Sequence, residues 1–304
     1  MKVSIVTSVY RSQGFLREFH SRTCEVLDRL AIEEAEFIYV IDGITDDSIA
    51  LLQSLKADDP RIRIIELSRN FGHHKAIMTG IRKSSGDRVF IIDCDLEEPP
   101  ELLATFYEHM DSENVDAVYG VQSARKGGWG ERIFGSFFYW AFNKLADVPI
   151  EKNILMARLV SRPYVDALSE FQERSLFLGG VFALVGFDQR SVEVEKGSRG
   201  ESNYSFRKRL SLMIDAITSS THRLLVYVFY LGILMSSISF IISLYYLTSA
   251  LFLKEYLGGW PSLILSIWFL SGVIILCLGV VGMYISKMFI EIKQRPLTVI
   301  KQEL

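Results

Sequence analysis

Two aspartates one residue apart are the feature of this sequence best suited to chemistry. Asp93 and Asp95 follow an apolar run and precede two prolines in the segment FIIDCDLEEPPE, residues 90–101. In an extended chain, residues at i and i+2 point to the same side, so both carboxylates would face one ligand. A hard divalent cation takes one or two protein carboxylates and completes its shell with water and substrate phosphates. Asp93 and Asp95 are therefore predicted to bind a hard divalent cation, which would neutralise a diphosphate leaving group.

A D-x-D pair by itself is more often a solvated turn or a helix cap, so its meaning depends on the chain around it. That chain alternates between strand and helix patterns. Strands are expected at Val3–Val9, Glu36–Ile41, Ile62–Leu67 and Arg88–Ile92, with helices at about 15–30, 48–56 and 75–82 between them. The alternation predicts parallel βαβ units and an α/β fold. Ligands of such sheets bind beyond the carboxyl ends of the strands, where Tyr10, Asp42 and the D-x-D pair fall.

Other potentially reactive residues have simpler interpretations. The adjacent His73 and His74 could ligate a metal, but flanking the start of a helix is the favoured interpretation. Cys94, between the two aspartates, is expected to be a small buried filler rather than a nucleophile. The cysteines are Cys24, Cys94 and Cys277, and no C-x-x-C pair occurs, so the sequence supports neither a disulfide framework nor a zinc site. The net charge of −3 excludes a polyanion-binding composition, and nucleic acid is not an expected partner.

Two long uncharged stretches, Leu224–Leu253 and Ser262–Ser286, follow the α/β region. Each exceeds the roughly 20 apolar residues that a membrane-spanning helix needs. The alternative is a pair of buried core helices, which rarely run so far without a charged face. We therefore expect two transmembrane helices joined by the short turn KEYLGGWP, and an integral membrane protein.

Basic residues flank the expected hairpin on both sides, whereas the turn contains only Lys254. The flanking residues are Arg207, Lys208, Arg209 and Arg223 before it and Lys287, Lys293, Arg295 and Lys301 after it. The positive-inside rule then places both termini in the cytoplasm, most simply at a bacterial inner membrane. Residues 1–222 would form a cytoplasmic domain ending in an amphipathic juxtamembrane helix at about 204–222. Residues 223–290 would form the hairpin, and residues 291–304 a cytoplasmic tail.

The aromatic stretch Trp129–Leu145 has two interpretations. It could be a helix in the core of the domain, or a helix that dips into the membrane interface, where aromatic side chains lie at headgroup depth.

Several motifs together resemble one protein family. They are VTSVY ending at Tyr10, IDGITDD (Ile41–Asp47), SRNFGHHKA (Ser68–Ala76), DCDLEEPPE (Asp93–Glu101) and RGESNYSFRK (Arg199–Lys208), followed by the apolar hairpin. The chain resembles family 2 glycosyltransferases of the GT-A fold, in the polyprenyl-phosphate branch. That branch includes bactoprenol glucosyltransferases and, more distantly, dolichol-phosphate mannose synthases. The resemblance implies a Rossmann-like, parallel-rich sheet and inverting transfer of a sugar, with UDP-linked sugars as the expected donors, to undecaprenyl phosphate.

The resemblance also implies roles for individual residues. Ser8 and Tyr10 would line the nucleobase pocket, and Asp42 would hydrogen-bond the base. Asp93 and Asp95 would hold the nucleotide diphosphate and its Mg²⁺ or Mn²⁺ ion. Arg69 and His73 would lie in a loop that closes over the donor. Positions implied near acceptor or phosphate groups are Arg199, Ser202 and Arg125, the last with a catalytic role.

Some positions depart from the family pattern. Met156 stands where relatives often have an acidic residue, and Ile44, Gln122 and Asn203 also differ from the usual residues. Two alternatives therefore stay open. The acceptor could be another glycolipid or a polysaccharide, or the chain could be a catalytically silent membrane adaptor. A homo-oligomer is compatible with the sequence.

Overall fold

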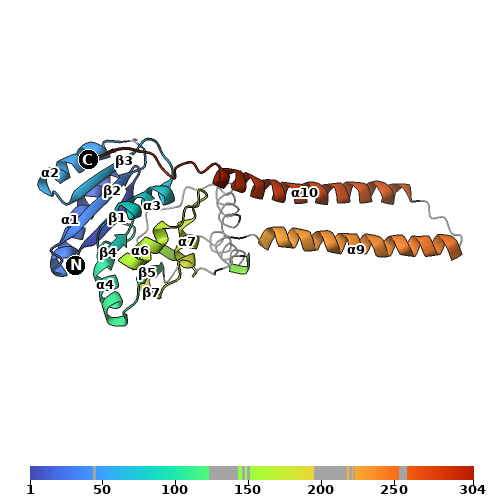
Figure 1. Cartoon of the computed structure of the whole chain (residues 1–304), viewed down its shortest axis with the longest axis horizontal. Coiled ribbons are helices and arrows are strands. Elements are labelled where there is room, and N and C mark those ends of the chain that lie inside the picture. The colour runs from blue at the N-terminus through green and yellow to red at the C-terminus, as the bar shows by residue number, and fades with distance from the viewer. Residues whose placement is uncertain are drawn as a thin grey trace.

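The computed structural model describes residues 1–43, 46–122, 143–145, 148, 151–194, 218, 221, 223–252 and 259–304. Figure 1 shows an α/β domain from which two long helices extend away together.

The described strands form one mixed sheet in the order β7-β5-β6-β4-β1-β2-β3-β8. Its centre is the parallel set β1 (Val3–Val9), β2 (Ala35–Ile41), β3 (Ile62–Leu67) and β4 (Arg88–Ile91). Beyond β4, strand β6 (Ile154–Ser161) runs antiparallel to both β4 and β5 (Ala117–Gln122). Strand β7 (Gln189–Val194) lies parallel to β5 at the edge. The predicted α/β fold and its four parallel strands are confirmed.

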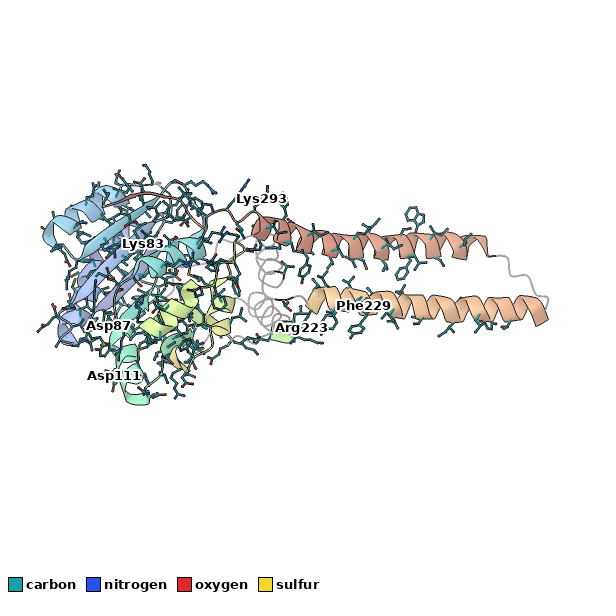
Figure 2. The ribbon with its side chains drawn as sticks, in the orientation of Figure 1. Lys83, Asp87, Asp111, Arg223, Phe229 and Lys293 are labelled. Atoms are coloured by element: carbon teal, nitrogen blue, oxygen red, sulfur yellow. The ribbon has the colours of Figure 1, made fainter. Side chains whose placement is uncertain are left out.

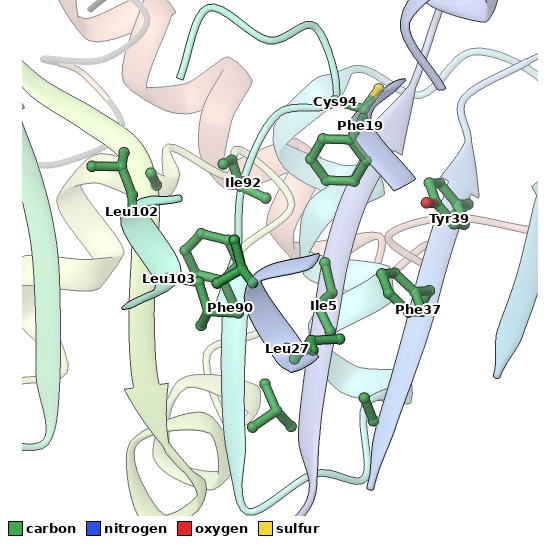
Figure 3. Packing of buried hydrophobic residues seen from close by; sticks show 14 of the residues in the cluster. Ile5, Phe19, Leu27, Phe37, Tyr39, Phe90, Ile92, Cys94, Leu102 and Leu103 are labelled. Atoms are coloured by element: carbon green, nitrogen blue, oxygen red, sulfur yellow. The ribbon is translucent and has the colours of Figure 1, made fainter. Parts of the chain in front are cut away.

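Helices cover both faces of the sheet, which explains why most residues of the central strands are apolar on both sides. Successive residues of β1 enter different cores, with Ile5 on one face and Val6 on the other. The first face packs against α1 (Gln13–Arg29), α2 (Ser48–Asp58) and α4 (Leu102–Glu113). Figure 3 shows the centre of this core, where Phe19 of α1 lies over the sheet near Tyr39 and Cys94.

The second face packs against three further helices. They are α3 (His73–Lys83), α6 (Arg162–Ser169) and α7 (Leu178–Leu184). Helix α3 is therefore held against the sheet while its first residues reach the carboxyl edge of the central strands.

The end of the chain, within the segment expected as a cytoplasmic tail, contributes a strand to the sheet. Strand β8 (Ile300–Glu303) pairs antiparallel with β3 and completes the sheet on that side. The Lys301 ammonium lies 2.7 Å from the carboxylate of Glu66, which is only 1% exposed. A buried carboxylate needs such partners, and an uncovered strand edge would present unpaired backbone groups. The last residues are thus part of the α/β domain.

Two long helices, α9 (Arg223–Phe252) and α10 (Trp260–Ile292), stand outside the domain core. Within α10, residues Ser266–Ile292 are long and apolar enough to cross a membrane. Most side chains of this segment lie outside the core, and Trp268, for example, is 77% exposed. The alternative of a buried core helix is therefore ruled out for this segment. In α9 the described residues include a shorter apolar helical segment, Arg223–Met235. A hairpin of two spans therefore stays a prediction.

Candidate active site

Three parallel strands end at one edge of the sheet and bring the predicted polar residues together. Strands β1 and β2 are paired from Val3 with Ala35 to Val9 with Ile41, and β1 also pairs with β4 up to Val6 with Ile91. Tyr10 therefore follows β1 where Asp42 follows β2, and the D-x-D pair follows β4 next to them. The predicted placement of these residues at a common carboxyl edge is confirmed.

His73 joins two of these strand ends. Its Nδ1 lies 2.8 Å from Ser8 Oγ, and its Nε2 lies 3.5 Å from Asp93 Oδ1. Burial lowers the pKa of His73, partly offset by the nearby carboxylates of Asp42 and Asp95, so the ring is neutral at physiological pH. Helix α3 begins at His73, which confirms the interpretation that the histidine pair marks a helix start. The His73 ring thus connects Ser8 on β1, which is expected to line the nucleobase pocket, to Asp93, which is expected to bind the diphosphate and its metal ion.

Asp42 has a structural role in addition to its predicted one. It is only 2% exposed, and its carboxylate accepts hydrogen bonds from the backbone N–H of Phe71 (2.6 Å) and Gly72 (2.9 Å). The Asn70 side-chain amide donates to the Asp42 carbonyl oxygen. The carboxylate expected to contact a base thus holds the loop of residues 68–72 in the shape that starts α3.

The glycine after Asp42 is required by this arrangement. Gly43 has a φ of 83°, and a Cβ there would lie 2.7 Å from the backbone nitrogen of Asn70. A side chain at this position would push the loop away from the strand ends.

Arg69 and Tyr10, two further predicted donor-site residues, are exposed around this edge. The Arg69 guanidinium lies 4.0 Å from the ring centre of Phe71 and donates to the Asn70 carbonyl oxygen. Tyr10 is 43% exposed, with the guanidinium of Arg11 lying 5.3 Å from its ring centre. Both side chains are positioned to meet a ligand from solvent.

The D-x-D turn is organised by its own backbone and by a buried glutamate. Asp95 Oδ1 accepts from the Glu97 N–H at 3.1 Å, and Leu96 adopts a left-handed conformation with φ 61°. Glu98 is 3% exposed, and its carboxylate accepts from the N–H groups of Met156 (3.2 Å) and Ala157 (2.7 Å) on β6. The turn is therefore tied to the neighbouring strand.

Sequence reasoning missed this role of Glu98, although the acidic run before the prolines contained it. Relatives often have an acidic residue where this chain has Met156. Here the Glu98 carboxylate, from another segment, accepts a hydrogen bond from the Met156 backbone N–H. Arg158, a buried guanidinium on β6, lies 3.5 Å from the ring centre of Phe182, and burial lowers its pKa to about 10, with Glu98 among the groups that favour its charge. Arg158 therefore stays charged at neutral pH.

Cys94 fills space as predicted. It is 1% exposed within the first core, its Sγ lies 3.3 Å from the Ser8 carbonyl oxygen, and burial raises the pKa of its thiol to about 12 (Figure 3). A thiol that stays protonated at neutral pH is a poor nucleophile.

Asp93 and Asp95 offer oxygen ligands that fit a hard cation. In the part of the chain that the structure describes, they belong to no group of three or more candidate ligands at this edge. Two carboxylates suit an ion that takes its other ligands from a substrate diphosphate and water, as Mg²⁺ and Mn²⁺ do.

The base of α10 reaches this edge through one loop. Glu291, near the end of α10, accepts hydrogen bonds from the backbone N–H groups of Arg174 (2.8 Å) and Ser175 (3.0 Å). The next residue, Leu176, has its carbonyl oxygen 3.5 Å from the ring nitrogen of His74. Burial, and then the neighbouring His73, lower the pKa of His74 to about 4. A continuous set of contacts thus connects the apolar helix to the start of α3.

Some predicted features lie outside the described residues. They are Arg125, Arg199 and Ser202, nearly all of the aromatic stretch 129–145 and nearly all of the amphipathic helix expected at 204–222.

Comparisons with known proteins identify the family of this chain. The profile of the family described as Glycosyl transferase family 2 matches residues 4–162. A protein of Mycobacterium tuberculosis (strain CDC 1551 / Oshkosh) named among putative glycosyltransferases is 42% identical over 99% of this chain and 88% of its own length. The chain belongs to glycosyl transferase family 2.

Two other proteins are also similar to this glycosyltransferase. An SfII prophage-derived bactoprenol glucosyl transferase of Shigella flexneri is 33% identical over 99% of this chain and 98% of its own length. Among solved structures, the mannosyltransferase PcManGT from Pyrobaculum calidifontis, in complex with GDP-Man and Mn²⁺, is 16% identical with a TM-score of 0.49, covering 71% of this chain and 63% of that chain.

Proposed function

We propose that this glycosyltransferase moves a sugar from a nucleotide sugar, with UDP-linked sugars as first candidates, to a polyprenyl phosphate such as undecaprenyl phosphate. The observation that carries the proposal is the path of contacts from α10 through Glu291 and Leu176 to His74, beside His73 and Asp93. Because α10 ends this close to the carboxyl ends of the strands, its insertion in a membrane would hold the candidate active site near the membrane surface. A lipid-linked phosphate could reach it there. The full-length match to a protein named as a bactoprenol glucosyl transferase supports the same acceptor class.

The donor would lie across the ends of β1, β2 and β4. Ser8 and Tyr10 would line the base pocket, with Arg69 and His73 on the loop side. Because the Asp42 carboxylate already holds that loop, contact of Asp42 with the base would require its bonds to Phe71 or Gly72 to be shared or exchanged.

Asp93 and Asp95 would hold a Mg²⁺ or Mn²⁺ ion, which when bound supplies positive charge to the departing diphosphate. The acceptor phosphate already carries an anionic oxygen, so no strong general base is needed to deprotonate the nucleophile. The chain then contributes mainly by positioning the reactants and by neutralising charge. We expect in-line attack at the anomeric carbon with inversion. Arg125, Arg199 and Ser202 are proposed to contact phosphate groups at or near the acceptor.

The charges at the base of the two helices support a cytoplasmic site. Figure 2 shows Arg223 and Lys293 at the ends of α9 and α10 that face the α/β domain, with Phe229 further along α9. By the positive-inside rule, the domain and both termini would then lie in the cytoplasm, with the helices in the inner membrane of a bacterium.

A panel assay tests the proposed reaction. Membranes containing the protein are incubated with undecaprenyl phosphate, dolichyl phosphate, or neither, and with individually labelled nucleotide sugars. Label in the lipid fraction that needs both polyprenyl phosphate and divalent ions is the expected result. Metal-dependent hydrolysis of a donor with no lipid product would point to another acceptor. No turnover of any donor by folded protein would favour the silent adaptor.

Arg199→Ala separates the two phosphate sites. A hydrogen bond to a charged group is worth roughly 1.5–3 kcal/mol, so kcat/KM for polyprenyl phosphate should fall at least about tenfold. Weakened donor binding with unchanged acceptor kinetics would assign Arg199 to the donor diphosphate instead.

A further inference from the structure

A second group of metal-ligating side chains, separate from the D-x-D pair, lies on the face of the sheet that α1 and α2 cover. His20 and Cys24 are one turn apart on α1, so their side chains lie on the same face of that helix. Asp59 follows α2 and comes just before β3, at the amino ends of the parallel strands. Among the described residues, these three are the group whose ligand atoms lie close enough together to share one ion.

The distances between the ligand atoms match a tetrahedral site. His20 Nε2 lies 3.2 Å from Asp59 Oδ2, and Cys24 Sγ lies 3.7 Å from His20 Nε2 and 3.9 Å from Asp59 Oδ2. Zinc bonds of about 2.0–2.2 Å to nitrogen or oxygen and about 2.3 Å to sulfur place such ligands roughly 3.3–3.7 Å apart. Shifts of a few tenths of an ångström would complete three corners of the tetrahedron.

The neighbouring residues orient these ligands as in known metal sites. His20 Nδ1 lies 3.2 Å from the hydroxyl of Tyr39, which is fully buried on β2. An Nδ1–H donated to this hydroxyl leaves the Nε2 lone pair free to face Cys24 and Asp59. Ligating histidines characteristically donate their other ring nitrogen in this way. Figure 3 shows Tyr39 and Phe37 side by side on β2, and the His20 ring lies 4.5 Å from that of Phe37, which fixes its plane.

Arg61 completes the surroundings and limits the charge of the site. Its Nε donates to Asp59 Oδ1 at 2.9 Å, and its Nη2 lies 2.8 Å from Asp59 Oδ2 and 3.4 Å from Cys24 Sγ. The Asp59 carboxylate and a Cys24 thiolate carry two negative charges, and the Arg61 guanidinium carries one positive charge. The site therefore has one net negative charge, and a bound divalent ion would change it to one net positive charge. The Arg61 side chain is one-third exposed, so its Nη2 can turn toward solvent while Nε keeps Oδ1.

We propose that His20, Cys24 and Asp59 bind a borderline-soft divalent cation of the Zn²⁺ class, with water in the fourth position. Binding forms a metal–sulfur bond as the Cys24 thiol loses its proton to solvent, and no electron is transferred. The ion would fasten α1 to the start of β3. Since none of the three ligands belongs to the D-x-D site, binding of the ion does not depend on the proposed function.

Cobalt(II) is the probe for the test, because a thiolate bound to Co²⁺ gives a near-ultraviolet charge-transfer band that oxygen ligands do not. Full-length protein is purified in detergent without a histidine tag or nucleotide and titrated with Co²⁺, then with Zn²⁺. We expect a single Co²⁺ per chain with this band, displaced by Zn²⁺. Cys24→Ser should abolish the band, and Tyr39→Phe should keep it while weakening affinity about ten- to a hundredfold.

Two controls make the result specific. His109 pairs with Glu113 on α4, and this pair includes no cysteine. His109→Gln should therefore leave the Co²⁺ titration unchanged. Asp95→Asn should keep the band, because the D-x-D site supplies no sulfur. Absence of the band in wild-type protein at excess Co²⁺ would overturn the proposal, as would its persistence in folded Cys24→Ser. Unchanged affinity in Tyr39→Phe would remove the orienting role of the hydroxyl.

Discussion

Replacing Glu98 by glutamine tests whether the D-x-D turn depends on its tie to β6. The carboxylate is 3% exposed and accepts from the N–H groups of both Met156 and Ala157. Glutamine has nearly the same volume but offers one oxygen and one NH₂ group. Its oxygen can keep the shorter bond to Ala157, while its NH₂ then faces the Met156 N–H, and that bond is lost.

The lost bond sets the minimum cost, because the Glu98 carboxylate also favours the charge of the buried Arg158. A hydrogen bond to a charged group contributes about 1.5–3 kcal/mol. At about 2–4 °C per kcal/mol for a domain of this size, the Tm should fall by roughly 3–12 °C. Asp95 is three residues away on the same turn, so the KM for the nucleotide sugar should rise as the turn loosens.

Thermal unfolding in detergent, followed by tryptophan fluorescence, measures the first effect, and donor-dependent kinetics measure the second. Glu108→Gln, the same substitution at an exposed position of α4, is the matched control and should leave both unchanged. A Glu98→Gln protein with the Tm and donor KM of the wild type would refute the reasoning. The two N–H groups would then be satisfied equally well without the carboxylate.

Three further predictions concern the metal, pH and topology. Asp95→Asn should abolish transfer while moving the Tm little, because the amide oxygen can still accept from the Glu97 N–H but cannot neutralise charge; wild-type turnover with divalent ions controlled would contradict the metal assignment. The folded-state pKa of His74 is lowered from 6.5 to about 4, so above pH 6.5 the ring is neutral in both states and no stability is lost. As pH falls from 6.5 toward 4 only the unfolded chain takes up the proton, and stability should drop by up to roughly 3 kcal/mol. Unfolding measured across this range should be less pH-dependent in His74→Gln than in the wild type, and equal slopes in the two proteins would refute the assignment. Reporter fusions at both termini should report cytoplasm, and a fusion in the turn between α9 and α10 the opposite side; a periplasmic signal from either terminus would overturn the orientation.

Local sequence was sufficient for the features that short-range physics controls. Predominantly apolar runs such as Val3–Val9 and Arg88–Ile91 predict strands that are buried on both faces, as parallel strands covered by helices on both sides are. Chain order then placed Tyr10, Asp42 and Asp93 at one edge, since parallel strands end on the same side. The burial of Cys94 and the helix start at His73 followed from the same patterns.

Contacts between distant segments could be found only in the tertiary structure. The last residues were predicted only as part of a cytoplasmic tail. They form β8, because Glu66 and the open edge of β3 need partners from another part of the chain. The partners of Glu98 lie 58 and 59 residues away on β6. Likewise, Cys24 appeared isolated because Asp59, 35 residues later, meets it only when α1 packs beside the start of β3. Periodicity reports which face of an element is buried, whereas the identity of the group that meets a buried charge or thiol depends on how the elements pack.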